Sequence, residues 1–299
     1  MDAPITLATE IVPATVTIHA RVPEQHPSAA ILGQERMGTG SVIDREGHIL
    51  TVNYIVLGAE TITVAFMNGR EVPAQIVSRD FESGLALIKI PAGRYPTIPV
   101  GDSRRLRAGQ AAFIVASLGD ENRRVSGGVV TAVEAFDAYW EYMLDRAILF
   151  TAPNPGVGGG PLVSSNGEIV GVVSLNLNEI ARMSLAIPVE VYAENAEELR
   201  RFGRITSRRP RAWMGFYAQP SEEGIVVAGV VPRGPADRCG VEEGDFILAV
   251  GEQQVADRRA LYRALWKHQA GERVRLTVMR RNAVKTVSVV SQDRAEFYY

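Results

Sequence analysis

From Pro13 to about Pro188 the chain consists of short stretches rich in Val, Ile and Thr, separated by turns that contain Gly, Asp or Asn. Examples are TITVAFM and LALIKI in the first half, and QAAFIVAS, VSGGVVTAV and GEIVGVVSL in the second half. These residue types favour strands. Short strands at such close spacing, without long helices between them, are typical of antiparallel barrels or sandwiches. Two successive β-barrels are the simplest prediction, with a break at YPTIPVGDSRRLRAGQ.

The pattern changes after Pro188. VEVYAENAEELRRFGRI has apolar residues at helical spacing with acids early and Arg late, which favours a helix, and TSRRPRAW is typical of a basic linker. From Trp213, strand-like segments alternate with two short helical ones, of which the second places Leu261 and Leu265 on one face. We therefore predict barrels over 1–100 and 101–190, a helix and linker over 191–211, a smaller domain over 212–291 and a tail over 292–299.

Charge and composition argue against several classes of protein. The net charge of −2 gives no reason to expect nucleic acid as a partner, and a single cysteine, Cys239, excludes an internal disulfide. No segment approaches the roughly 18 apolar residues that span a bilayer. No His, Cys, Asp or Glu pair has metal-ligand spacing, so we expect no metal and no other cofactor.

The first twenty residues have neither the basic start nor the long apolar run of a secretory signal. We therefore expect a cytoplasmic protein if the chain is complete, and a periplasmic or other extracytoplasmic one if it has been trimmed.

Three segments carry a resemblance to a known family. GTGSVIDREGHILTVNYIV, DFESGLALIKI and NPGVGGGPLVSSNGEIVGVVS resemble, in this order, the stretches that carry the catalytic His, Asp and Ser of the HtrA/Deg serine proteases. SLAIP resembles the strand that lines their substrate groove. The resemblance extends from about residue 11 to 291. It implies a mainly β chain: a trypsin-like double β-barrel followed by a PDZ domain, which is an α+β, partly open barrel with two helices.

The residues at the three catalytic positions differ from those of the family. Its histidine falls at Tyr54, its aspartate at Gly84 and its serine at Gly158. Glycine supplies neither a nucleophile nor a carboxylate, and a phenol with a pKa of about 10 does not accept a proton at neutral pH as imidazole does. We therefore predict that the chain is not an enzyme but a proteolytically inactive family member, a pseudoprotease.

Other parts of the site are open to more than one interpretation. Ser164, Ser165 and His48 are weak candidates for a replacement nucleophile and base. The turn NPGVGGGP either keeps an oxyanion-binding loop, with Gly156, Val157 and Gly159 as its backbone, or is only a tight glycine turn. EAFDAYWEYMLD is either an ordinary barrel hairpin or an exposed aromatic contact patch.

The resemblance also implies a peptide-binding site in the PDZ domain. Met214, Gly215 and Phe216 match the loop whose N–H groups accept a peptide's terminal carboxylate. Leu261 and Leu265 on the facing helix either form the pocket for the ligand's last side chain or belong only to the core.

We predict a bacterial peptide- and protein-binding adaptor or regulator in protein quality control, which binds protein C-termini or extended peptides through its PDZ domain. One alternative is a subunit that assembles with an active HtrA-type paralogue. Another is a serine endopeptidase with a rearranged site. The chain is compatible with a homo-oligomer, but trimer formation is not implied, because the segment before Pro13 lacks the aromatic residues that support trimers in many family members.

Overall fold

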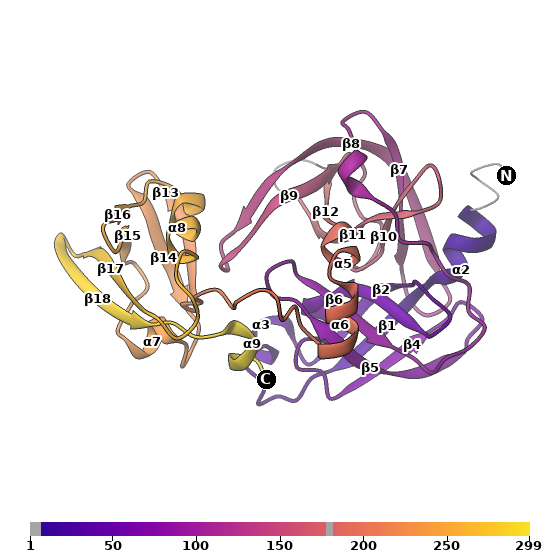
Figure 1. The fold of residues 1–299 in the computed structure, drawn as a ribbon, viewed down its shortest axis with the longest axis horizontal. Coiled ribbons are helices and arrows are strands. Elements are labelled where there is room, and N and C mark those ends of the chain that lie inside the picture. The colour runs from indigo at the N-terminus through magenta and orange to yellow at the C-terminus, as the bar shows by residue number, and fades with distance from the viewer. Residues whose placement is uncertain (1–6, 178–181) are drawn as a thin grey trace. The chain divides into compact units, whose positions relative to one another are not determined.

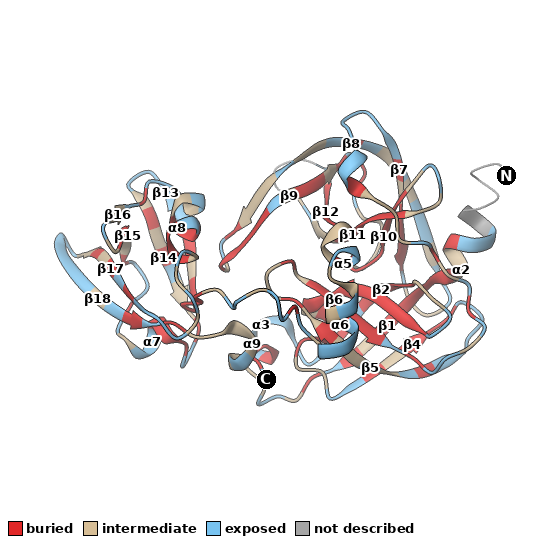
Figure 2. Cartoon of the chain, viewed as in Figure 1, coloured by how far each residue is buried: buried red, intermediate tan, exposed pale blue. Residues whose placement is uncertain are grey.

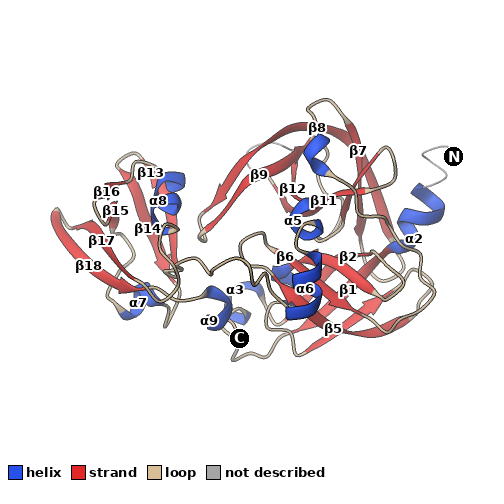
Figure 3. Ribbon diagram, viewed as in Figure 1, coloured by secondary structure: helices blue, strands red, loops and turns tan. Residues whose placement is uncertain are grey.

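The computed structural model describes residues 7–177 and 182–299 and is built mainly from strands (Figure 1). The helices are short, as Figure 3 shows. The chain forms two compact units, one of residues 1–135 with 145–206 and the other of residues 136–144 with 207–299. The predicted fold class, mainly β with two barrels followed by a smaller α+β domain, is confirmed.

The first barrel closes in the strand order β1-β2-β3-β6-β5-β4. Its strands are β1 (Thr15–Arg21), β2 (Glu35–Val42), β3 (His48–Val52), β4 (Thr61–Ala65), β5 (Glu71–Arg79) and β6 (Leu85–Lys89). β1 closes the barrel because it pairs with both β2 and β4. Closure removes the unpaired strand edges that an open sheet would expose.

The interior of this barrel is filled by β-branched side chains, and Figure 2 shows β1 and β2 largely in the buried colour. Ile18 and Ile49 are both fully buried. They meet over Gly40, where an added Cβ would lie 2.5 Å from Ile49 Cγ2 and 2.8 Å from Ile18 Cδ1. Glycine at this position therefore leaves the space that the two isoleucines occupy.

The second barrel closes in the order β10-β11-β12-β9-β8-β7. Its strands are β7 (Ala111–Ser117), β8 (Arg123–Ala138), β9 (Tyr142–Phe150), β10 (Pro161–Ser164), β11 (Ile169–Asn176) and β12 (Ser184–Pro188). Ile114, Ile148, Phe150 and Leu162 are fully buried in its core. β8 is the longest strand, with 16 residues, and its last residues leave the first unit.

The helical segments of the first unit are short, and they precede β1, lie between strands or follow the second barrel. They are η1 (Leu7–Ile11), α2 (Val12–Ala14), α3 (Ala29–Leu32), α4 (Asn53–Val56), η2 (Ser103–Arg105), α5 (Glu190–Ala193) and α6 (Ala196–Phe202). α6 carries acids in its first turn and arginines in its last, as the helix dipole favours, and it ends at Gly203 in the left-handed conformation. No helix among the described residues is long and apolar enough to cross a membrane.

The second unit contains an antiparallel sheet in the order β13-β14-β15-β17-β18, with β16 paired to β15. Its strands are β13 (Phe216–Ser221), β14 (Gly224–Val230), β15 (Phe246–Val250), β16 (Gln253–Gln254), β17 (Arg273–Arg280) and β18 (Ala283–Val290), and its helices are α7 (Pro235–Arg238), α8 (Arg258–Leu265) and α9 (Arg294–Phe297). The Asp257 carboxylate caps α8 by accepting a hydrogen bond of 2.7 Å from Ala260 N. This cap fixes where the helix begins and so which of its residues face the sheet.

The segment Phe136–Leu144, which we call the hairpin tip, belongs to the second unit although its strands β8 and β9 continue into the second barrel. Glu141, Tyr142 and Met143 are buried, whereas Tyr139 is exposed. The hairpin tip is therefore a hairpin of the second barrel, as one of the two interpretations had it, and its end packs into the second unit. It is not an exposed aromatic patch, because Tyr139 is the only exposed one of its four aromatic residues.

We predict that Gly40→Ala lowers the free energy of unfolding by about 1–3 kcal/mol, because the new Cβ overpacks the barrel against Ile18 and Ile49. Gly127→Ala on β8 is the matched control, since its Cβ would meet only Phe113 at 3.4 Å. We expect that control to stay within about 0.5 kcal/mol of wild type. Urea unfolding followed by circular dichroism measures both, and equal midpoints for the two variants would contradict this description of the core.

Candidate functional site

The turn before β10, residues 154–160, is held by Thr39 of β2. Thr39 N donates to Gly158 O at 2.7 Å, and Thr39 Oγ1 donates to Val157 O, also at 2.7 Å. The same hydroxyl accepts a hydrogen bond of 3.0 Å from Ser117 N on β7. One threonine of the first barrel thus fixes the turn of the second barrel to the end of β7.

The three residues predicted to form an oxyanion loop have hydrogen-bond partners inside the protein. Val157 N donates to Ser117 O at 3.1 Å and Gly159 N donates to Val173 O at 2.7 Å. Gly156 N faces Asn154 Oδ1 at 3.5 Å. Because two of these N–H groups are used by backbone carbonyls, binding an oxyanion through them requires the turn to change conformation. The oxyanion role of this loop stays a prediction.

Tyr54 on α4 fills the space beside Gly158. Its hydroxyl donates to Ser174 O on β11 at 2.9 Å. A Cβ added at Gly158 would lie 2.1 Å from that hydroxyl oxygen, while the next nearest atom, Ser174 O, would be 3.2 Å away. Burial raises the pKa of Tyr54 to about 12, so the phenol stays protonated at neutral pH. The residue types at positions 54 and 158 therefore depend on each other sterically.

Gly84, the third predicted position, lies at the turn between β5 and β6. Its φ of 81° is left-handed, a conformation in which a side chain is strained. Gly84 N donates to Asp80 O at 2.8 Å, and Gly84 O accepts from Asn53 N at 2.7 Å. The left-handed backbone at this position favours glycine, and glycine supplies no carboxylate.

Two of the three weak candidates for a replacement pair, His48 and Ser164, have local partners, and Ser165 is exposed. His48 is buried, and its Nδ1 lies 2.8 Å from Asp44 Oδ2. The Ser164 hydroxyl accepts a hydrogen bond of 3.3 Å from Asn166 N. Within the described parts of the chain, no group of three or more His, Cys, Asp and Glu side chains is placed to hold a metal ion.

The predicted carboxylate-binding loop of the second unit holds a carboxylate. Met214 N donates to Glu141 Oε2 at 3.0 Å, and Gly215 N and Phe216 N donate to Glu141 Oε1 at 2.6 and 3.0 Å. Gly215 has a φ of 78°, and this left-handed conformation lets consecutive N–H groups point to one side. Burial raises the pKa of the Glu141 carboxyl, and the three N–H groups oppose that effect.

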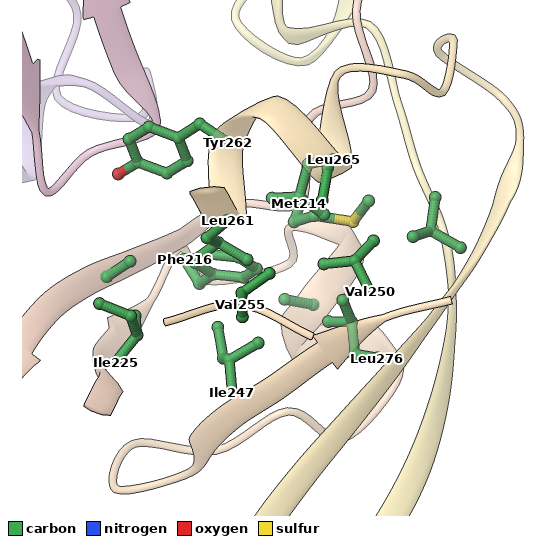
Figure 4. Close-up of a cluster of buried hydrophobic side chains, with 14 of the residues drawn as sticks. Met214, Phe216, Ile225, Ile247, Val250, Val255, Leu261, Tyr262, Leu265 and Leu276 are labelled. Atoms are coloured by element: carbon green, nitrogen blue, oxygen red, sulfur yellow. The ribbon is translucent and has the colours of Figure 1, made fainter. Parts of the chain in front are cut away.

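The two predicted pocket leucines are fully buried. Leu261 and Leu265 of α8 belong to the same apolar cluster as Met214 and Phe216, as Figure 4 shows. Met143 of the hairpin tip is part of this cluster too. The packing agrees with both interpretations that the sequence left open. If a side chain of the same chain fills a ligand pocket, the residues that line the pocket are also part of the core.

Two residues with important contacts are absent from the sequence-based predictions. Thr39 fixes a turn that lies 118 residues away, and Glu141 reaches a loop 73 to 75 residues away. Glu141 is one of four acids amid four aromatic residues in EAFDAYWEYMLD, and the sequence does not distinguish it from the other three. The sequence gives no signal for Thr39 either.

Residues 38–172 match the family model of a trypsin-like peptidase domain, and residues 212–290 match that of a PDZ domain. The chain thus joins a trypsin-like peptidase domain to a PDZ domain. It belongs to the HtrA/Deg family.

The relatives include a protein named as a probable periplasmic serine endoprotease DegP-like, from Halomonas elongata. It is 32% identical over 89% of this chain and 59% of its own length. The serine endoprotease DegS of Haemophilus influenzae is 28% identical over 94% of this chain and 85% of its own length. The chain therefore spans about 59% of the DegP-like relative and most of DegS.

Solved structures with the same fold include the HtrA-type protease AlgW with a decapeptide and the serine endoprotease from Yersinia pestis. Both have a TM-score of 0.60, at 24% identity and with 98% of this chain covered; the matches cover 99% and 98% of the respective chains. At 24% sequence identity, this similarity establishes a common fold and nothing about activity.

The prediction that the chain is not an enzyme is contradicted by these comparisons, because the relatives are named serine endoproteases. That prediction depended on the residue types at Tyr54, Gly84 and Gly158. Those residues determine only whether the Ser-His-Asp mechanism is available at these three positions. They do not decide the activity of a whole protein in a family of proteases.

We predict that Gly158→Ala destabilises the wild type by about 1–3 kcal/mol and is tolerated better in a Tyr54→Phe background. The physical reason is that the close contact of the new Cβ is with the Tyr54 hydroxyl oxygen, which phenylalanine lacks. Urea unfolding of the wild type, the two single variants and the double variant gives the coupling free energy, for which we expect about 1–2 kcal/mol.

Tyr54→Phe alone serves as the control for the lost hydrogen bond to Ser174 O. Additive effects of the two substitutions would contradict the steric dependence between positions 54 and 158.

Proposed function

We propose that this chain is a peptide- and protein-binding adaptor or regulator that acts through its PDZ domain. The observation that supports this most directly is the Glu141 carboxylate on three consecutive N–H groups of the loop 214–216. The terminal carboxylate of a peptide has the same two oxygens and the same charge. The loop therefore has the chemistry to bind a protein C-terminus.

The strand beside this loop suits an extended peptide. β13 directly follows the loop and is the edge strand of its sheet, since β14 pairs with it on one side only. A peptide whose C-terminus lies on the loop can extend the sheet along β13. A protein of the same fold, AlgW, has been solved with a tripeptide and with a decapeptide, which is consistent with peptide recognition in this architecture.

A second candidate function is serine endopeptidase activity, favoured by the names of the relatives. Gly158 supplies no nucleophile, so such activity would use a hydroxyl at another position. Adaptor function and proteolysis differ in one measurable respect, since only proteolysis consumes the bound protein.

For the first function we predict that the full chain distinguishes a free C-terminal carboxylate from an amide. Two fluorescein-labelled decapeptides of identical sequence, one ending in a carboxylate and one in an amide, are titrated with wild type and with Glu141→Ala. We expect the carboxylate form to bind at least about tenfold more tightly to one or both proteins, because charge-assisted hydrogen bonds to the loop are lost with the amide. Equal binding of the two peptides to both proteins would exclude the proposed site.

The second candidate function is tested on the same protein preparation. Digestion of unfolded casein, together with labelling by a fluorophosphonate probe, reports an active serine. We expect intact casein and no labelling if the protein acts by binding alone. Cleavage that the probe abolishes would favour this second function, with a nucleophile at a position other than 158.

A further inference from the structure

We propose that the hairpin tip is an intrachain ligand of the PDZ groove, so that a peptide C-terminus binds only by displacing it. This inference rests on the proposed function, because it assigns a form of regulation to the same loop, strand and pocket. The hairpin tip occupies three features of the groove that would recognise a peptide. They are the carboxylate-binding loop, the outer edge of β13 and the apolar pocket beside α8.

The first feature is the carboxylate-binding loop. Glu141 is buried and uses both carboxylate oxygens on the N–H groups of the loop. Its backbone has a φ of 51°, which is a strained conformation for a residue with a side chain. This conformation places the Glu141 carboxylate at the end of the hairpin, where a ligand's terminal carboxylate would lie. The three hydrogen bonds offset the cost of the backbone strain.

The second feature is the outer edge of β13. Ala218 N donates to Tyr139 O of the hairpin tip at 2.8 Å. The rings of Tyr139 and Tyr217 also meet edge to face, with centroids 5.7 Å apart. A peptide that extends the sheet along β13 would need the N–H group of Ala218, and Tyr139 already uses it.

The third feature is the apolar pocket between the loop and α8. Met143 packs into the cluster that contains Met214, Leu261 and Leu265. It is only 7% exposed, although it lies in a segment that continues from the second barrel. Its side chain thus takes the place that the pocket would give to the last side chain of a bound peptide.

α8 adds contacts that hold the hairpin tip. Tyr262 Oη donates to Ala138 O at 2.6 Å and accepts a hydrogen bond of 3.1 Å from Glu141 N. Figure 4 shows that the Tyr262 side chain points away from Leu261 and Leu265. Asp137 forms ion pairs with Arg258, at 2.6 Å, and with Arg259. These polar contacts can be exchanged for water when the segment leaves, unlike the packing of an ordinary core.

An intrachain ligand has a large competitive advantage. The hairpin tip belongs to the same chain as the groove, 73 to 75 residues from the loop, so its binding is intramolecular and it weakens the apparent affinity of a free peptide even when its own contacts are modest. A peptide must supply a carboxylate, a strand and an apolar side chain together to displace it. The hairpin tip therefore selects for ligands that fill all three features.

The test compares peptide binding by full-length variants in which the hairpin tip is weakened. The probe is a fluorescein-labelled decapeptide that ends in methionine with a free carboxylate, followed by fluorescence anisotropy. We expect Glu141→Ala to bind it about 10–100-fold more tightly than wild type, and Glu141→Ala combined with Met143→Ser to bind at least as tightly. Glu134→Gln, at an exposed position of β8, is the matched control and should bind as wild type does.

Each outcome separates the inference from the proposed function. Carboxylate-selective binding with the same affinity in wild type and both Glu141 variants overturns the inference and leaves the proposed function intact. Binding in none of the proteins, with circular dichroism showing that all are folded, overturns the proposed function and with it displacement. An NMR chemical shift of the Gly215 amide that is the same in wild type and in Glu141→Gln also overturns the inference. The N–H group of Gly215 would then have an acceptor other than Glu141.

Discussion

The hydrogen bonds between the Glu141 carboxylate and three backbone N–H groups are the interaction on which the placement of the hairpin tip depends. Met214, Gly215 and Phe216 are buried or nearly so, and their N–H groups point to one acceptor because Gly215 is left-handed. Without that acceptor, three donors would lose hydration with no partner, at a cost of about 1–3 kcal/mol each. The carboxylate in turn brings Met143 into the apolar cluster and places the backbone of the hairpin tip beside Tyr262 and β13. Under the proposed function, the site for a ligand and the site of internal packing are the same set of atoms.

The first unit shows how strongly a site depends on its surroundings. Thr39 ties the turn around Gly158 to β2 and β7, and Tyr54 occupies the space that a side chain at position 158 would need. The N–H groups of Val157 and Gly159 are used by carbonyls. The glycine-rich turn is therefore a packed part of the barrel in this structure, and its chemistry depends on how readily these bonds are exchanged.

Much of the fold could be predicted from the sequence, because strand patterns and motifs are local signals. The runs of Val, Ile and Thr indicate both barrels, and the three resembling segments identify the family. The contacts of Glu141 and Thr39 could not be predicted, since each joins positions at least 73 residues apart and no local pattern records the partner. Leu261 and Leu265 remained ambiguous for a related reason, because sequence shows that a side chain is buried but not what covers it. The prediction about activity was wrong because it extended residue types at three positions to the whole protein.

The contact between Tyr54 and Gly158 also has a consequence for how such a sequence changes over generations. Any residue with a Cβ at position 158 meets the Tyr54 hydroxyl at 2.1 Å, and that hydroxyl is itself held by Ser174 O. Replacing the tyrosine before a side chain is introduced at position 158 avoids a destabilised intermediate, whereas the reverse order passes through one. The left-handed backbone at Gly84 separately disfavours a side chain at that position. Side chains at positions 84 and 158 are therefore opposed by two independent features, one of backbone conformation and one of packing.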